Sequence, residues 1–109
     1  NLYVTGTWGG TVNFGGGARA ANGVRDIFVT RLTTPALSWN WDVLLGGTDP
    51  GTNPELSYGI DRGLDGGIRV AGRYTETVDF QPGAGVTNRT MGGGQYDGFL
   101  WRCDNTGNW

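Results

Sequence analysis

The sequence predicts an all-β fold in which short antiparallel strands occur as a repeated unit. Glycine supplies 22 of the 109 residues, and that much glycine disfavours long helices. Short segments of alternating apolar residues lie between turns rich in Gly, Pro and Asn, and no segment has a convincing helical period. Nearly the same phrase also occurs twice, as GTVNFGGG at Gly10–Gly17 and as ETVDFQPG at Glu76–Gly83. Together, these observations favour repeated β-units over a helical or mixed fold.

The repeat consists of two blocks. Leu2–Asn22 aligns with Ile68–Asn88 at an offset of 66 residues, and Asp26–Leu32 aligns with Asp97–Cys103 at an offset of 71. The five extra residues are expected near RTMGGG, because a Gly-rich loop tolerates insertions. Positions shared by the two copies include Gly6/Gly72, Trp8/Tyr74, Asn13/Asp79, Phe14/Phe80, Asp26/Asp97, Phe28/Phe99 and Arg31/Arg102.

Six segments read as strands of this unit. They are LYVTG at 2–6, DIFVTRL at 26–32, LSWNWDVLL at 37–45, LSYGID at 56–61, IRVAG at 68–72 and DGFLWRC at 97–103. The repeated Thr-Val-Asn/Asp-Phe is expected to be a short extended connection between the second and third strands. Permissive glycine in one copy, and Pro-Gly in the other, turns the chain after it. The sequences GGTDPGTNP, RGLDGG, DNTG and TTPA are predicted turns.

The strand at 26–32 indicates how the sheets pack. Ile27 and Val29 lie on one face, and Phe28 and Leu32 lie on the other, so both faces are largely apolar. Four short strands per unit, covered on both faces, predict β-propeller blades, each a four-stranded antiparallel sheet between two neighbours. A β-sandwich would show cleaner alternation, and a parallel β-helix would need a shorter repeat of about 20–30 residues.

The repeat also resembles a known family, the bacterial β-propeller repeat called SBBP. Its pattern is matched by Tyr58–Gly59, Tyr3–Gly6, Gly10–Phe14 and Asp26–Val29. The resemblance covers nearly the whole chain, and the second copy departs from the pattern at Arg69, Glu76, Gly98 and Cys103. It implies a propeller fold and a bacterial protein that is secreted or displayed at the cell surface.

The domain organisation predicted from the repeat is a single β-propeller segment over 1–109. A first, partial blade covers 1–45, and a second blade covers 55–109 with its last strand incomplete, giving about one and two-thirds units. Propellers need roughly four to eight blades to close. The expected partners are therefore the rest of a longer propeller chain or identical copies of this one. The opening NLYVTG has neither an initiating Met nor a signal peptide, which suggests the interior of a longer or processed chain.

The composition argues against several classes of function. The net charge is −2, and all eight basic residues are Arg, so a basic nucleic-acid surface is not expected. Histidine, the commonest general base and metal ligand, is absent. No apolar run approaches the roughly 18 residues of a membrane span. The one cysteine, Cys103, stands where Leu32 stands in the other copy and is expected to be a buried, inert thiol. A disulfide to a part of the protein outside this sequence is the alternative.

Six polar positions that recur in the repeat are predicted to be structural: Asn13, Asp79, Asp26, Asp97, Arg31 and Arg102. A catalytic site is needed once per ring, whereas a turn cap or an inter-blade contact is needed once per blade. A ligand pocket repeated in each blade is the alternative. Trp39, Trp41, Trp101 and Trp109 are expected to pack within strands.

Trp8 and Tyr74 are the candidate ligand-binding residues, because an aromatic ring after the second strand could stack on a sugar. Covering the edge of a blade is the alternative role. Glu76 and Asp79 are the one close acidic pair on a predicted loop, and nothing else supports acid–base chemistry there. The oxygens of DRGLDGG and DNTG fit turns better than calcium ligation. No enzyme activity, metal or cofactor is expected.

The functional hypothesis is a non-catalytic extracellular or cell-surface scaffold that binds protein or glycan. One alternative is a structural assembly protein that forms an oligomeric ring or a filament. Another is the non-catalytic part of a larger secreted enzyme. Fold alone does not decide among them, because propellers carry many functions.

Overall fold

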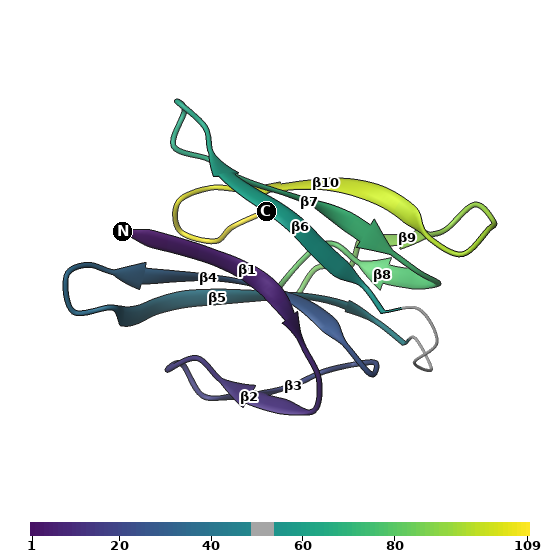
Figure 1. Cartoon of the computed structure of the whole chain (residues 1–109), viewed down its shortest axis with the longest axis horizontal. Coiled ribbons are helices and arrows are strands. Elements are labelled where there is room, and N and C mark those ends of the chain that lie inside the picture. The colour runs from purple at the N-terminus through teal and green to yellow at the C-terminus, as the bar shows by residue number, and fades with distance from the viewer. Residues whose placement is uncertain (49–53) are drawn as a thin grey trace.

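The computed structural model describes residues 1–48 and 54–109, which contain β-strands and no helix (Figure 1). The predicted all-β class is confirmed, and every strand pairing is antiparallel. The strands of the described ranges are β1 (Leu2–Trp8), β2 (Thr11–Asn13), β3 (Ala18–Ala20), β4 (Asp26–Thr33), β5 (Ser38–Gly47), β6 (Leu56–Arg62), β7 (Ile68–Tyr74), β8 (Thr77–Asp79), β9 (Asn88–Thr90) and β10 (Asp97–Cys103). Residues 49–53 of the predicted GGTDPGTNP turn lie outside the described part of the chain.

All six predicted strands are present, as β1, β4, β5, β6, β7 and β10. The Thr-Val-Asn/Asp phrase forms β2 in the first copy and β8 in the second. Each is one arm of a hairpin, with β3 or β9 as the other arm. The arms β3 and β9 were not predicted, because each is only three residues long, too short for a recognisable alternation of apolar and polar side chains.

The strands form two main layers. The first contains β1, β4 and β5 in that order, and the second contains β10, β7 and β6. The hairpin β8–β9 belongs to the second copy by sequence but extends the sheet of the first, because Gly46 and Gly47 of β5 pair with Asp79 and Val78. The described residues thus form sheets of five, three and two strands, and the four-stranded blade stays a prediction.

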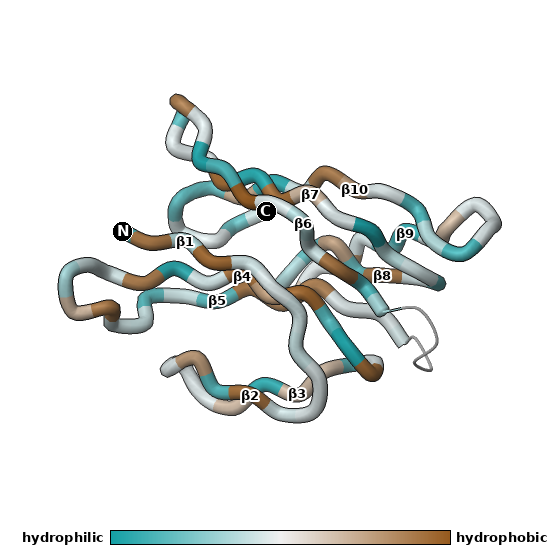
Figure 2. Tube along the Cα trace, in the orientation of Figure 1, coloured by the Kyte–Doolittle hydropathy of each residue, from teal (hydrophilic) through white to brown (hydrophobic). Residues whose placement is uncertain are grey.

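The hydrophobic core lies between the two layers. Ile27 and Val29 of β4 are fully buried, as are Ile68 and Val70 of β7. Figure 2 shows apolar stretches along both β4 and β7. The remaining core residues are Val43, Leu45, Tyr74, Val78, Phe80, Trp101 and Cys103. Each large side chain buried in this way stabilises the fold by about 1.5–3 kcal/mol.

The other face of β4 is covered differently. Phe28 points away from the core and contacts Phe14 of the β2–β3 hairpin, with ring centroids 4.6 Å apart. The predicted split of β4, with Ile27 and Val29 on one face and Phe28 on the other, is therefore confirmed. Apolar residues cover the strand on both sides, as the sequence indicated.

The structure corrects the position of the insertion in the repeat. Val12 pairs with Arg19 in the first hairpin, and Val78 pairs with Arg89 in the second. The turn of the first hairpin is residues 14–17, whereas that of the second is residues 80–87. Most of the extra length therefore lies in the β8–β9 turn rather than at RTMGGG. It follows that Arg19 and Arg89 are equivalent, which the sequence alignment had not shown.

Candidate functional site

Trp8 and Tyr74, the predicted sugar-stacking residues, are both buried. Each side chain is only 8% exposed. Trp8 packs edge-on against Phe28, and Tyr74 packs at 87° against Phe80 with centroids 5.2 Å apart. Both rings are therefore largely covered by neighbouring aromatic side chains, although Tyr74 also lines a cavity. The sugar-stacking role of Trp8 and Tyr74 stays a prediction, as does the alternative that they cover the edge of a blade.

Asp26 and Asp97 begin the equivalent strands β4 and β10, and each caps the loop before its strand. Oδ2 of Asp26 accepts the N–H of Asn22 (2.7 Å), and Oδ1 accepts that of Gly23 (3.3 Å). Oδ2 of Asp97 accepts the N–H of Gly92 (2.8 Å). Burial raises the pKa of Asp26, and the two N–H donors partly oppose that rise.

Asn13 and Asp79 occupy equivalent positions at the ends of β2 and β8, and both organise hairpin turns. Oδ1 of Asn13 accepts the N–H groups of Gly15 (2.8 Å) and Gly17 (3.2 Å). Oδ1 of Asp79 accepts those of Gln81 (3.0 Å) and Thr87 (2.8 Å). The same side-chain chemistry therefore closes a short turn in one copy and a long turn in the other.

Arg31 and Arg102 are equivalent in sequence but make different contacts. Nη1 of Arg31 donates to the carbonyl of Asn105 (2.9 Å), which ties β4 to the turn after β10. Nη2 of Arg102 donates to Asp65 in the turn between β6 and β7 (3.0 Å). The first contact joins the two layers, and the second stays within one. The six recurring polar residues are thus distributed over separate turns and contacts rather than gathered into one site.

Cys103 is buried in the core, with 2% of its surface exposed. Desolvation, reinforced by the charge of Asp104, raises the pKa of its thiol to about 12. A thiol held in this state is neither a nucleophile nor a metal ligand near neutral pH. Cys103 therefore acts chemically as a small apolar core residue.

The acidic side chains of the two predicted turns have hydrogen-bonding or charged partners within the protein. Oδ1 of Asp104 in DNTG accepts the hydroxyl of Thr106 (2.6 Å) and the N–H groups of Asn108 and Thr106, and these bonds lower the pKa of Asp104 to about 2. Asp65 of DRGLDGG forms ion pairs with Arg69 and Arg102, both at 3.0 Å. Within residues 1–48 and 54–109, no three acidic or cysteine side chains gather as metal ligands would. The hydrogen bonds of Asp104 close its own turn, whereas the ion pairs of Asp65 join its turn to β7 and β10.

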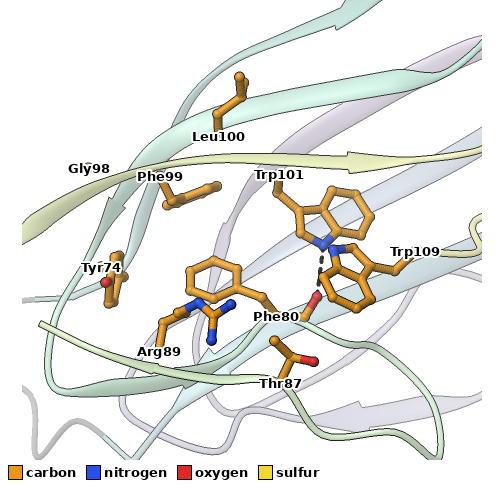
Figure 3. A pocket seen from close by; sticks show the side chains of 9 residues that line it. All are labelled: Tyr74, Phe80, Thr87, Arg89, Gly98, Phe99, Leu100, Trp101 and Trp109. Atoms are coloured by element: carbon orange, nitrogen blue, oxygen red, sulfur yellow. Dashed lines mark hydrogen bonds between the residues drawn. The ribbon is translucent and has the colours of Figure 1, made fainter.

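One cavity combines aromatic, cationic and hydroxyl groups. Its volume is about 350 Å³, and Figure 3 shows its lining residues: Tyr74, Phe80, Thr87, Arg89, Gly98, Phe99, Leu100, Trp101 and Trp109. Trp101, one of these residues, donates a hydrogen bond from Nε1 to the carbonyl of Phe80 (2.9 Å). Among the predicted site residues, only Tyr74 belongs to it.

Sequence reasoning missed this cavity for two reasons. Trp109 was expected inside a strand, but it lies beyond β10 and is 54% exposed. Arg89 was not singled out, because its equivalence to Arg19 depends on the hairpin registers. Of the other expected packing residues, Trp101 is buried and Trp41 packs against the core, whereas Trp39 is 36% exposed.

No family model, curated protein or solved structure matches this chain. The residues described by the structure include no helix long and apolar enough to cross a membrane.

Proposed function

We propose that this chain is a β-propeller segment of the SBBP type that serves as a non-catalytic binding scaffold. In this proposal β1, β4 and β5 belong to one blade, and β6, β7 and β10 belong to the next. The scaffold acts outside the cell or on the surface of a bacterium, as the family resemblance implies. Its binding partner is protein or glycan, and its contacts with further blades come from a longer chain or from identical copies.

The observation that carries the proposal is that a hairpin of the second unit pairs with a strand of the first unit. The β8–β9 hairpin arises between the second and third strands of its own unit, yet it pairs with Gly46 and Gly47 at the end of β5. Phe80 of the same hairpin packs on Phe99 of its own unit, with centroids 5.2 Å apart. Such a hairpin links consecutive blade-like sheets. The β2–β3 hairpin, which packs through Phe14 on Phe28, is its counterpart in the first unit.

The outward face of the second layer supports packing against a further unit. Leu100 of β10 is 74% exposed, whereas Val29, its repeat equivalent on β4, is fully buried between the layers. Arg102 on the same strand is likewise equivalent to Arg31, which bridges the layers. The face that includes Leu100 therefore corresponds to one that the first unit buries. This correspondence also favours the second candidate function, an assembly protein in which copies pack face to face as a ring or a filament.

The proposal is tested by native mass spectrometry of the purified source protein together with a glycan array and a protein pull-down. A mass well above 11.6 kDa in one chain, or a closed multiple of 11.6 kDa, is the expected result. Specific capture of a glycan or protein supports the scaffold role. An assembled ring that captures neither supports the assembly protein instead. A stable monomer of 11.6 kDa contradicts the propeller itself.

A further inference from the structure

Asn22 and Gly23 form the one Asn-Gly pair of the sequence, in the loop between the first hairpin and β4. Asn22 is exposed, and its side chain makes no hydrogen bond or ion pair with any residue in the ranges 1–48 and 54–109. A side chain that is free to rotate can bring its amide carbon, Cγ, to the backbone nitrogen of the next residue. Because that residue is a glycine, no side chain hinders the approach to its nitrogen.

The second unit forms the same loop without an asparagine. Because Arg19 is equivalent to Arg89, the residue equivalent to Asn22 is Gly92. The backbone N–H groups of Asn22 and Gly92 both donate to the aspartate that caps their loop, at 2.7 and 2.8 Å. The loop is therefore built from backbone contacts, and it does not need the side-chain amide of Asn22.

Asp26 contacts the backbone nitrogen of Gly23. Its Oδ1 accepts the N–H of Gly23 (3.3 Å), while its Oδ2 accepts that of Asn22 (2.7 Å). A carboxylate in this place can take up the proton that the Gly23 nitrogen must lose when it forms a new bond, which is the role of a general base. Burial raises the pKa of Asp26, so its ionised carboxylate is a stronger base than an exposed one.

We propose that Asn22 is a site of spontaneous deamidation, with Asp26 as the proton acceptor. The nitrogen of Gly23 attacks Cγ of Asn22, and its proton passes to Asp26. The bond between Cγ and the side-chain nitrogen breaks, and that nitrogen takes up a proton from water and leaves as ammonia. The product is a five-membered succinimide ring, which water opens at either carbonyl to leave aspartate or isoaspartate at position 22. Overall, one water is consumed and one ammonia is released, and nothing is oxidised or reduced.

Position 22 lies at the junction between the two units. Asn22, Gly46, Gly47 and Asp79 all line a cavity of about 310 Å³. The carboxylate of Asp26 lies against Gly46, where a Cβ would begin. Because Gly46 and Gly47 are the residues of β5 that pair with β8, a negative charge formed at position 22 lies beside the pairing that joins the units.

The new carboxylate is added to two acidic side chains, Asp26 and Asp79. In residues 1–48 and 54–109 the arginines form ion pairs with Asp42 and Asp65, so no ion pair neutralises Asp26 or Asp79. Like charges at short range repel one another, and the β5–β8 pairing consists of only two residue pairs. Deamidation therefore weakens the attachment of the β8–β9 hairpin to the first unit. The reaction requires no ligand, so it goes beyond the proposed scaffold function and does not depend on it.

The first test incubates the folded 109-residue protein at neutral pH and 37 °C and analyses the tryptic peptide Ala20–Arg25 by mass spectrometry. We expect this peptide to gain about one dalton and to separate into aspartate and isoaspartate forms, relative to protein digested without incubation. Asn13 is the internal control, because its Oδ1 already accepts two N–H groups and it precedes a bulky Phe14. A peptide that stays unmodified in the folded protein, but is modified in denatured protein, overturns the proposal.

Asp26→Asn tests the proton acceptor. An amide oxygen is a much weaker base than a carboxylate, so the modification of Asn22 should slow by about tenfold or more. Circular dichroism verifies that the variant is folded. An unchanged or faster rate in the folded variant contradicts the role given to Asp26.

The second test compares two variants at position 22. Asn22→Asp reproduces one product of the reaction, and Asn22→Gly, the matched control, introduces the residue of the second unit without a charge. Amides of the β5–β8 pairing should exchange hydrogen about tenfold faster in Asn22→Asp than in Asn22→Gly, because the added charge favours local opening. Equal exchange in the two folded variants contradicts the weakened attachment of the hairpin.

Discussion

Gly72 lies directly opposite Phe99 in the β7–β10 pair, and the phenyl ring occupies the space where a side chain at position 72 would begin. A Cβ at Gly72 would lie 2.8 Å from Cε1 of that ring. Gly6 and Phe28 repeat the arrangement in the first unit, with the same 2.8 Å approach. The repeat therefore preserves a tight packing contact as well as its sequence pattern.

Gly72→Ala should destabilise the protein by about 1–3 kcal/mol, because the phenyl ring and the adjacent carbonyl of Leu56 would have to move. Chemical denaturation followed by fluorescence measures the change. Gly59→Ala is the matched control, since β6 leaves open space around a Cβ there; it should change stability by no more than about 0.5 kcal/mol. Equal effects of the two substitutions would contradict the packing described.

Val29 and Leu100 occupy equivalent positions in the repeat, but Val29 is buried and Leu100 is exposed, so substitutions at the two positions should differ in their effect on stability. Val29→Ala should cost about 1–3 kcal/mol, because it leaves a cavity between the layers. Leu100→Ala should change the stability of the isolated chain by less than about 0.5 kcal/mol. If that face packs on another copy, Leu100→Asp should lower the assembly mass measured by native mass spectrometry. An unchanged assembly mass would rule out copy-to-copy packing through Leu100.

Cys103 should not react with a thiol reagent at pH 8 in the folded protein and should react readily in denaturant. Its pKa of about 12 in the folded state also predicts a pH effect. The folded state holds the proton more tightly than the unfolded state, whose thiol has an ordinary pKa near 9.0. The stability that the buried, protonated thiol contributes is therefore fully present below pH 9 and is lost as the pH rises toward 12.

A Cys103→Ala variant should lack that part of the alkaline loss, and urea titrations of both proteins at pH 8 and pH 10.5 would measure it. If the native thiol is modified at pH 8 as quickly as in denaturant, the buried placement is wrong.

The raised pKa of Asp26 should likewise make the stability of the protein depend on pH, in this case on the acid side of neutrality. Its folded pKa is raised above 3.8, so the folded state favours the protonated form. Its contribution to stability is full below that pH and declines as the pH rises through the raised pKa. Because Asp26→Asn resembles the neutral acid, its free energy of unfolding should rise relative to that of wild type as the pH increases from 3 to 7. Urea unfolding of both proteins across that range measures this difference. A free energy of unfolding that rises more for wild type than for the variant would contradict the prediction.

The sequence predicted the all-β class and six of the strands, because alternation and turn residues are local signals. It missed β3 and β9, whose tripeptides are held by pairing with β2 and β8 rather than by their own composition. It also misplaced the insertion, because matching Asn22 to Asn88 ignored the hairpin registers. Asn88 belongs to β9, whereas Asn22 lies in the loop that Asp26 caps.

The site was harder to predict than the fold. Trp8 and Tyr74 have the right chemistry for stacking, but burial by Phe28 and Phe80 depends on tertiary packing. The cavity brings together Arg89, from a hairpin, and Trp109, from beyond the last described strand, and no local sequence pattern connects them.

The pairing of β8 with β5 means that the boundary between structural units differs from the boundary between sequence repeats. A recombination event that exchanged one repeat at the junction between β5 and β6 would separate Gly46 and Gly47 from the Val78 and Asp79 with which they pair. Gly46 must also accommodate the carboxylate of Asp26, against which a Cβ would clash. Folded chimaeras of such repeats should therefore take the end of β5 and the β8–β9 hairpin from the same parent sequence.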